Sequence, residues 1–215
     1  MKTMVLAASF PVSGHFDPAE AIDPDAFGAQ PPLVLPDCTW EQYLAIDAAL
    51  GDRRGVRVRF LQGYLELMFP TSLEHERRKT HLGCLVETWC LERDIEFFIN
   101  GETTLKRECE AAGAPDESYV FGGAKERPDL VIEVALTSGG LSKRAFYRRF
   151  AIPELWIWRN DALEVHQLSP EGNDCTTATE SAVLPGIPLA DVAECAKIES
   201  ASQAIREFQR RARNA

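Results

Sequence analysis

A single acidic residue inside an apolar segment constrains the fold of this chain most strongly. Residues 129–136 read DLVIEVAL, with Glu133 near the middle. Successive side chains of a β-strand point to opposite faces, so one face of this segment is entirely apolar and should pack against a helix. Glu133 lies on the other face. Because a buried carboxylate without a partner is costly, we expect a cation beside Glu133, either a metal ion or a basic side chain.

The neighbouring carboxylates differ in how well they could share a metal ion with Glu133. Asp129 lies four residues away along the same strand, a separation of roughly 13 Å, whereas Mg²⁺ holds its ligands at about 2.1 Å. Asp116 lies just before SYVF (118–121), separated from it by one residue, and this predicted strand could pair beside DLVIEVAL. We therefore predict that Asp116 lies near Glu133 and that Asp129 fixes the entrance of the strand. The alternative for Asp116 is a turn residue that caps local amides after Pro115.

The helix predicted at residues 141–151 supplies a basic side chain. Lys143 lies ten positions beyond Glu133, and Tyr147 follows Lys143 by four positions. Residues four apart share a helical face, so both side chains should point the same way. If that face turns toward the strand, the Lys143 ammonium can approach Glu133 and orient a water molecule or stabilise charge on a phosphate. The alternative for Glu133 is a buried structural ion pair with Lys143 or an arginine.

The remaining pattern is typical of a mixed α/β protein. A capping box formed by Thr39 and Gln42 predicts a helix over 40–50, and alternating apolar residues predict a hairpin over 56–69 that turns at Gln62–Gly63. Further predicted elements are a helix at 72–93, strands at 95–100 and 103–108, a hairpin at 154–168 that turns at Asn160–Asp161, and a helical segment at 189–213 with a weaker middle. We expect one mixed sheet flanked by helices. The expected regions are an irregular N-terminal arm (1–38), a core (39–188) and a C-terminal helical segment (189–215).

Charge and cysteine content limit the classes of function. The chain has 215 residues and a net charge of −10, which by itself argues against non-specific binding to nucleic acid. Its basic clusters, including 53–59 and 206–213, are interpreted as solvated faces. None of the six cysteines forms a CxxC pair, which favours reduced thiols in a cytoplasmic protein. No apolar run approaches the roughly 18 residues needed to span a bilayer, so no membrane partner is expected.

Several motifs in order resemble a known family. They are YLELMFPTSLEHER (64–77), the PD pair Pro115–Asp116, LVIEVALTSGG (130–140), Lys143 with Tyr147, and PELW (153–156). Over residues 39–170 the chain resembles the Uma-two family of restriction endonucleases, part of the PD-(D/E)XK nuclease superfamily. PD alone is a weak signal, but the motifs in this order are specific.

This resemblance implies a restriction-endonuclease-like fold and Mg²⁺-dependent hydrolysis of phosphodiester bonds, with Mn²⁺ as a substitute ion. It implies that Asp116 and Glu133 are metal ligands and catalytic residues. The superfamily pattern has a lysine two positions after the glutamate, where this chain has Ala135. Lys143 would then act as the catalytic lysine from the following helix, with Tyr147 beside it. A glutamate from the first core helix, Glu76 or Glu74, is a further candidate ligand.

Two functions are therefore considered. The first is a metal-dependent endonuclease that acts on nucleic acid, DNA in preference to RNA. The second is a catalytically inactive, nuclease-like binding or assembly module, which Ala135 and the acidic net charge favour. A homodimer is expected in either case, with the arm at 1–37 and the hairpin that carries Trp156 and Trp158 as its candidate surfaces.

Overall fold

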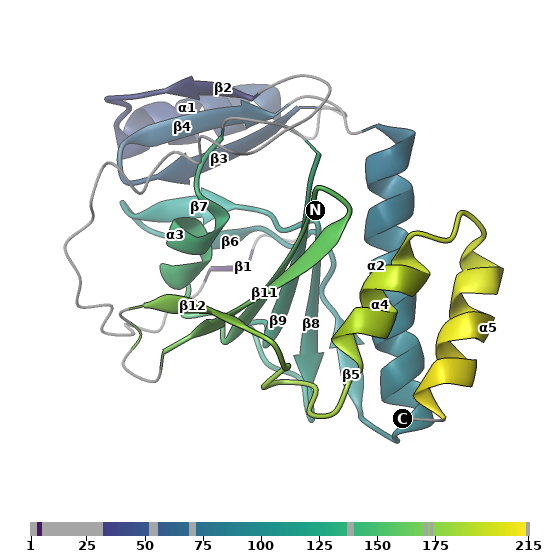
Figure 1. Ribbon diagram of the computed structural model, residues 1–215. Coiled ribbons are helices and arrows are strands. Elements are labelled where there is room, and N and C mark those ends of the chain that lie inside the picture. Colours follow the sequence, from purple (N-terminus) through teal and green to yellow (C-terminus); the bar gives the residue numbers. More distant parts are fainter. Residues whose placement is uncertain are drawn as a thin grey trace.

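The strands of this mixed α/β protein are divided between two sheets. The computed structural model describes residues 32–51, 56–68, 72–136, 140–169, 172 and 174–213, together with the backbone of residues 4–5. Within these residues each sheet has six strands. The two sheets lie one above the other, and helices cover their faces (Figure 1). The mixed α/β class is confirmed, but the expectation of one sheet is wrong.

The first sheet contains the predicted hairpin around Gln62–Gly63. Its strand order is β1 (Met4–Val5), β6 (Leu105–Arg107), β7 (Ala111–Gly113), β3 (Arg57–Leu61), β4 (Tyr64–Met68) and β2 (Leu33–Leu35). Gln62 and Gly63 both have positive φ angles, 46° and 86°, as a tight hairpin turn requires. Helix α1 (Trp40–Leu50) begins at the predicted capping box and packs Trp40 and Tyr43 on Phe60.

The second sheet contains the strand that carries Glu133. Its order is β12 (Cys175–Ala178), β11 (Ala162–Leu168), β10 (Glu154–Arg159), β9 (Leu130–Ala135), β8 (Glu117–Phe121) and β5 (Phe97–Ile99). Strand β9 runs parallel to β10 and antiparallel to β8. All six residues of β9 are buried, so both faces of this central strand are covered.

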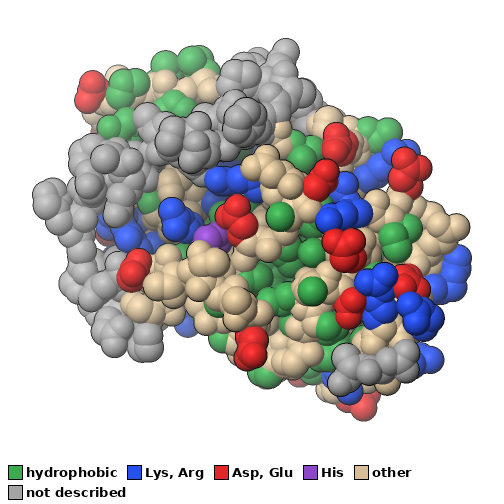
Figure 2. Space-filling model, viewed as in Figure 1, with side chains coloured by type: hydrophobic (Ala, Val, Ile, Leu, Met, Phe, Trp, Pro, Cys, Tyr) green, Lys and Arg blue, Asp and Glu red, His purple; other side chains and the backbone are tan. Residues whose placement is uncertain are grey.

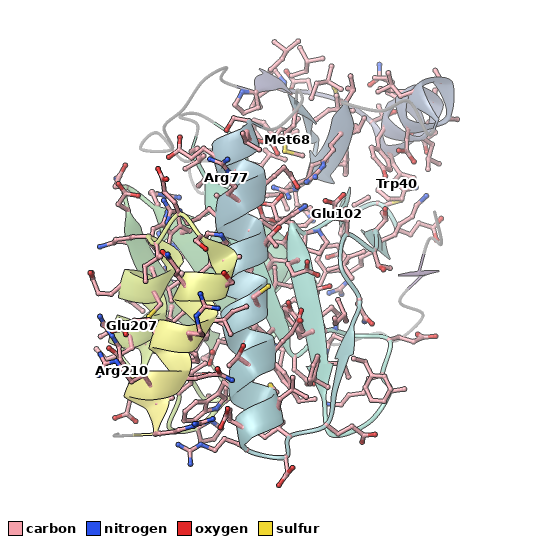
Figure 3. All side chains as sticks on the ribbon, turned by 90° about the vertical axis from the view of Figure 1, so that its right-hand side faces the viewer. Trp40, Met68, Arg77, Glu102, Glu207 and Arg210 are labelled. Carbon is pink, nitrogen blue, oxygen red and sulfur yellow. The ribbon has the colours of Figure 1, made fainter. Side chains whose placement is uncertain are left out.

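Different helices cover the two faces of β9. On the apolar face, Leu130, Ile132 and Val134 share a core with α2 (Leu73–Glu92). Helices α4 (Leu189–Ala196) and α5 (Ala201–Ala212) pack on the outside of α2 (Figures 1 and 3). On the opposite face, the short helix α3 (Lys143–Arg148) lies between the two sheets. The two-faced pattern of DLVIEVAL is thereby confirmed, because the apolar face meets a helix and the Glu133 face meets the first sheet and α3.

Four short strands escaped the sequence pattern. They are β1 and β2, which lie inside the predicted irregular arm, β7 and β12. Strand β7 has the sequence Ala-Ala-Gly, which is poor in the β-branched and aromatic residues that favour strands. Its neighbours β3 and β6 impose the extended conformation through backbone hydrogen bonds.

Two further expectations concern the surface. Trp156 and Trp158 are fully buried in the core against α2, so they cannot form the dimer surface expected for their hairpin. The prediction that the C-terminal basic cluster is solvated is confirmed for Arg210, which pairs with Glu207 on the outer side of α5 (Figure 3). Acidic and basic side chains are interspersed over this side of the molecule (Figure 2). Residues 1–31 of the arm lie outside the described side chains.

Two further expectations concern the cysteines and membrane-spanning helices. All six cysteines are free thiols, as predicted. In the part of the chain that the structure describes, no helix combines the length and the apolar character needed to cross a membrane.

The packing of α2 on β9 should dominate the stability of the second sheet. Leu85 is completely buried between them, whereas Leu91 on the same helix is 70% exposed. We expect Leu85→Ala to lower the free energy of unfolding by about 2–5 kcal/mol through the lost burial and the cavity left behind. Leu91→Ala should change it by no more than about 0.5 kcal/mol. Urea denaturation of both variants measures the difference, and equal effects would contradict this packing.

Candidate functional site

Asp116 and Glu133 come together through the pairing of two adjacent strands. In the antiparallel pair of β8 and β9, Glu117 lies opposite Ile132. Asp116 directly precedes β8 at the end that lies beside Ile132 and Glu133. The backbone N–H of Val134 donates a hydrogen bond of 2.9 Å to Asp116 Oδ2 and so fixes this end of the pair. Asp116 is thereby held beside the strand segment that carries Glu133, next to Val134.

Three donors converge on the Glu133 carboxylate. Lys143 Nζ lies 3.0 Å from Oε2, and Tyr147 donates its hydroxyl to Oε1. Helix α3 therefore turns its Lys143–Tyr147 face toward the strand, as predicted. The third donor is Arg59 Nη2, 2.8 Å from Oε1. Glu133 is only 1% exposed, and Lys143, Tyr147 and Arg59 all bind its carboxylate.

Asp116 is held by side chains from the other sheet and from α2. Arg57 Nη1 donates to Oδ1 at 2.8 Å, and His75 Nε2 lies 3.1 Å from Oδ2. Burial raises the pKa of Asp116, but the hydrogen bond and charge of His75, together with Lys143 and Arg57, hold that pKa well below its usual range. Burial lowers the pKa of His75, and the hydrogen bond and charge of Asp116 more than offset this, so the pKa is raised.

Arg59 and Glu66 complete the buried part of the cluster. They face each other across the β3–β4 hairpin, and Arg59 Nη1 lies 3.6 Å from Glu66 Oε2. The other oxygen of Glu66 accepts a hydrogen bond from the backbone N–H of Leu141 at 2.9 Å, just before α3. The two side chains are 1% and 2% exposed. Burial lowers the pKa of Arg59, but the charges of Glu133, Tyr147 and Glu66 raise it by more. The pKa is therefore raised overall, and Arg59 stays charged.

The rim of the cluster carries partly exposed charges. Glu102 accepts hydrogen bonds from Arg57 Nη2 at 2.9 Å and from Lys79 Nζ at 2.8 Å. Figure 3 shows Glu102 beside α2, close to the ends of the strands. Lys79 also pairs with Glu76 at 2.8 Å, and Glu76 lies 3.4 Å from His75 Nδ1.

The first core helix therefore reaches the cluster through a different residue from the two predicted. His75 is in contact with Asp116, whereas Glu76 lies at the rim and Glu74 is exposed on the first turn of α2. Among the described residues, no three or more His, Cys, Asp or Glu side chains form a group that could hold a metal ion. Instead, basic residues lie between the carboxylates.

Four members of the cluster were missed from the sequence: Arg57, Arg59, Glu66 and His75. The strand 57–60 reads RVRF, which places both arginines on one face opposite Val58 and Phe60. That alternation was the available signal, since it shows two charged residues on the inner face of a half-buried strand. The interpretation of the 53–59 cluster as a solvated face is wrong for Arg59. Asp129 fixes the start of β9 as predicted, by accepting the Phe121 N–H at 2.8 Å.

The depth of the cluster predicts how stability responds to removal of a charge. Glu133→Ala would leave Arg59 buried without its main counter-ion, which should cost about 3–5 kcal/mol. Glu102→Ala removes a carboxylate that is 45% exposed and should cost at most about 1 kcal/mol. Chemical denaturation of the two variants tests this contrast. A cost below about 1 kcal/mol for Glu133→Ala would show that the buried pair does not stabilise the fold.

Comparisons with known proteins agree with the motifs around this cluster. The chain is similar to "a putative nuclease belonging to DUF820 from Anabaena variabilis ATCC 29413", a solved structure, with 12% identity and a TM-score of 0.45 over 79% of this chain and 98% of that one. No curated protein matches the chain. Residues 40–191, which contain all the cluster residues described above, match the Uma2 family, whose description is "Putative restriction endonuclease". This match spans well over half of the sequence, and the protein therefore belongs to the Uma2 family.

Proposed function

We propose that this protein is an endonuclease that hydrolyses phosphodiester bonds of DNA with Mg²⁺, for which Mn²⁺ can substitute. The observation that carries the proposal is the position of Lys143, 3.0 Å from the Glu133 carboxylate, on a strand whose next residue, Val134, donates its backbone N–H to Asp116. Two converging carboxylates and a lysine are the groups that metal-assisted phosphodiester hydrolysis requires. Membership of the Uma2 family supports the same reaction class.

The chemistry of the donors suits a hard divalent ion. Mg²⁺ prefers oxygen ligands, and Asp116, Glu133 and Glu66 offer carboxylate oxygens. Glu66 Oε2 is buried and makes no hydrogen bond within the described residues. It forms an ion pair with Arg59 Nη1 at 3.6 Å, which is longer than a hydrogen bond.

The charges of the cluster limit how a divalent metal ion could bind there. Three carboxylates (Asp116, Glu133 and Glu66) face three bases (Arg57, Arg59 and Lys143), and His75 adds a further positive charge when it is protonated. Arg57 is 28% exposed and Lys143 16%, whereas Arg59 is 1% exposed. If the two outer bases turn to phosphate oxygens, Arg59 and the three carboxylates retain a net charge of −2. This equals the charge that one Mg²⁺ carries, but the match is one of charge alone, because the described residues contain no group of three or more His, Cys, Asp or Glu side chains that could hold a metal ion.

Each residue then has a defined task. Asp116 and Glu133 would hold the ion, which when bound supplies a more acidic water and neutralises charge on the phosphate. Lys143 positions the attacking water or stabilises the developing negative charge. Tyr147 donates its hydroxyl to Glu133 and orients the carboxylate, and His75 does the same for Asp116. Arg57 binds the phosphate from the rim.

The choice of DNA as substrate, the homodimer and the cytoplasmic location stay predictions. The dimer no longer has the Trp156–Trp158 hairpin as a surface, because both side chains are buried. The arm at residues 1–37 is the other surface expected from the sequence, and its residues 1–31 lie outside the described side chains.

A second candidate function is a nuclease-like module that binds nucleic acid without cleaving it. The internal balance of charges favours it, because a centre in which every Asp116 and Glu133 oxygen already has a protein partner is stable without a metal ion. A mobility-shift assay and a cleavage assay together separate the two functions. This module would bind DNA in the mobility shift and yield no cleavage product with either Mg²⁺ or Mn²⁺.

Nicking of a supercoiled plasmid in Mg²⁺ tests the first function. Asp116→Asn and Lys143→Met should each lower the rate by at least about 100-fold, because they remove metal-binding and charge-stabilising groups. Lys125→Met is the matched control. Lys125 pairs with Asp129 at the far end of the strand, so this variant should cleave the plasmid at the normal rate. Circular dichroism checks that each variant is folded.

Removal of the metal provides an independent prediction. Chelation by EDTA should stop cleavage, and added Mg²⁺ or Mn²⁺ should restore it. Full activity of Asp116→Asn, or cleavage that continues in EDTA, would contradict the assignment of this cluster as the reaction centre.

A further inference from the structure

Glu102 lies in the turn between β5 and β6, and the backbone of this turn is held on both sides of it. Before Glu102, the N–H of Gly101 donates to the Ser118 carbonyl at 3.3 Å. After it, the N–H of Thr103 donates to the Asn100 carbonyl at 3.2 Å. The Glu102 side chain itself is 45% exposed. Because the backbone is fixed and the side chain is hydrated, Glu102 can release its partners by side-chain rotation alone.

Two basic side chains converge on a single oxygen of Glu102, and we refer to them as the rim pair. Arg57 Nη2 lies 2.9 Å and Lys79 Nζ lies 2.8 Å from Glu102 Oε1. Arg57 comes from β3 and Lys79 from α2, and they are only 28% and 13% exposed. Burial lowers the pKa of Lys79, but its bonds to Glu102 and Glu76 raise that pKa by more, so Lys79 stays charged.

The rim pair is continuous with the cluster around Asp116. Arg57 donates Nη1 to Asp116 and Nη2 to Glu102, so one guanidinium extends from the buried carboxylate to the rim. An anion bound by the rim pair therefore lies next to the proposed reaction centre. A carboxylate oxygen that accepts from an arginine and a lysine at once resembles a phosphate oxygen in charge and in its hydrogen bonds.

We infer that Arg57 and Lys79 form a binding site for a backbone phosphate of DNA, and that Glu102 occupies this site until the DNA displaces it. The ion pairs of a half-exposed carboxylate are weak, because water screens them, so the displacement costs little. It replaces one negative charge by another and leaves the rim pair neutralised. The displaced carboxylate stays nearby and competes, so Glu102 weakens DNA binding. The inference rests on the proposed function, because it takes DNA as the ligand.

Removal of the Glu102 charge should strengthen DNA binding. Fluorescence anisotropy of a short labelled DNA duplex, in EDTA so that no strand is cleaved, gives the Kd of the whole protein. Glu102→Gln keeps the size of the side chain and should lower the Kd at least about fivefold at low salt, because the rim pair is freed and a repulsive charge is lost. The matched control, Glu96→Gln, removes the same charge from an exposed residue just before β5 and should change the Kd by less than about twofold.

Lys79→Met separates the loss of a competing side chain from a general effect of charge. This variant should raise the Kd, because one of the two phosphate donors is lost. When Glu102→Gln is added to Lys79→Met, the Kd should fall by less than about twofold, because the site that Glu102 blocks is no longer complete. A general effect of charge would instead tighten binding by the same factor with and without Lys79. Thermal melting of each variant checks that it is folded.

The possible results distinguish this inference from the function on which it rests. An unchanged Kd for Glu102→Gln, in a protein that cleaves plasmid DNA, would overturn the role of Glu102 and leave the nuclease proposal intact. Equal tightening by Glu102→Gln and Glu96→Gln would also overturn it. If neither the natural protein nor Glu102→Gln binds the duplex and the natural protein cleaves no plasmid, both proposals fail. If Lys79→Met does not fold, the comparison of Glu102→Gln with Glu96→Gln still decides the question.

Discussion

The ion pair between Arg59 and Glu133 is the interaction on which the rest of the structure depends. It joins a strand of one sheet to the central strand of the other, with both side chains only 1% exposed. A buried pair of this kind is stable only when its geometry is good, because each ion has lost its hydration. The two sheets can therefore approach in few ways. Gly113 makes room for the arginine, and Phe146 and Tyr147 of α3 enclose it between the sheets.

The charges of the cluster are arranged by depth. Arg59, Glu66 and Glu133 lie in the interior, Asp116 lies just outside them at the end of β8, and Arg57 and Lys143 reach in from partly exposed positions. Exposure decides what each charge can do. A base that keeps contact with water can change partner at little cost, whereas a buried one is held by the loss of hydration that any movement would require. This gradient separates charges that are fixed in the interior from bases that can change partner at the surface.

Part of this site was predictable from local patterns. Glu133 stood out because it interrupts an apolar strand, and Lys143 and Tyr147 were matched to it by their spacing on the next helix. Asp116 was found because its strand could pair directly with β9. Each of these contacts arises between elements that follow one another closely in the chain. Arg59, Glu66 and His75 were missed because their contacts cross from a distant hairpin and an earlier helix, over separations that no periodicity encodes.

The sequence by itself determined which face of β9 is apolar, where the hairpins turn, where α1 and α2 begin, and that Glu133 needs a cation. These features follow from side-chain alternation, turn residues and capping, all of which act within a few residues. Only the tertiary structure decided that the strands form two sheets and that an arginine, not only Lys143, meets Glu133 between them. The physical reason is that a buried charge selects its partner by position in space, and that position exists only after both sheets have packed around α3.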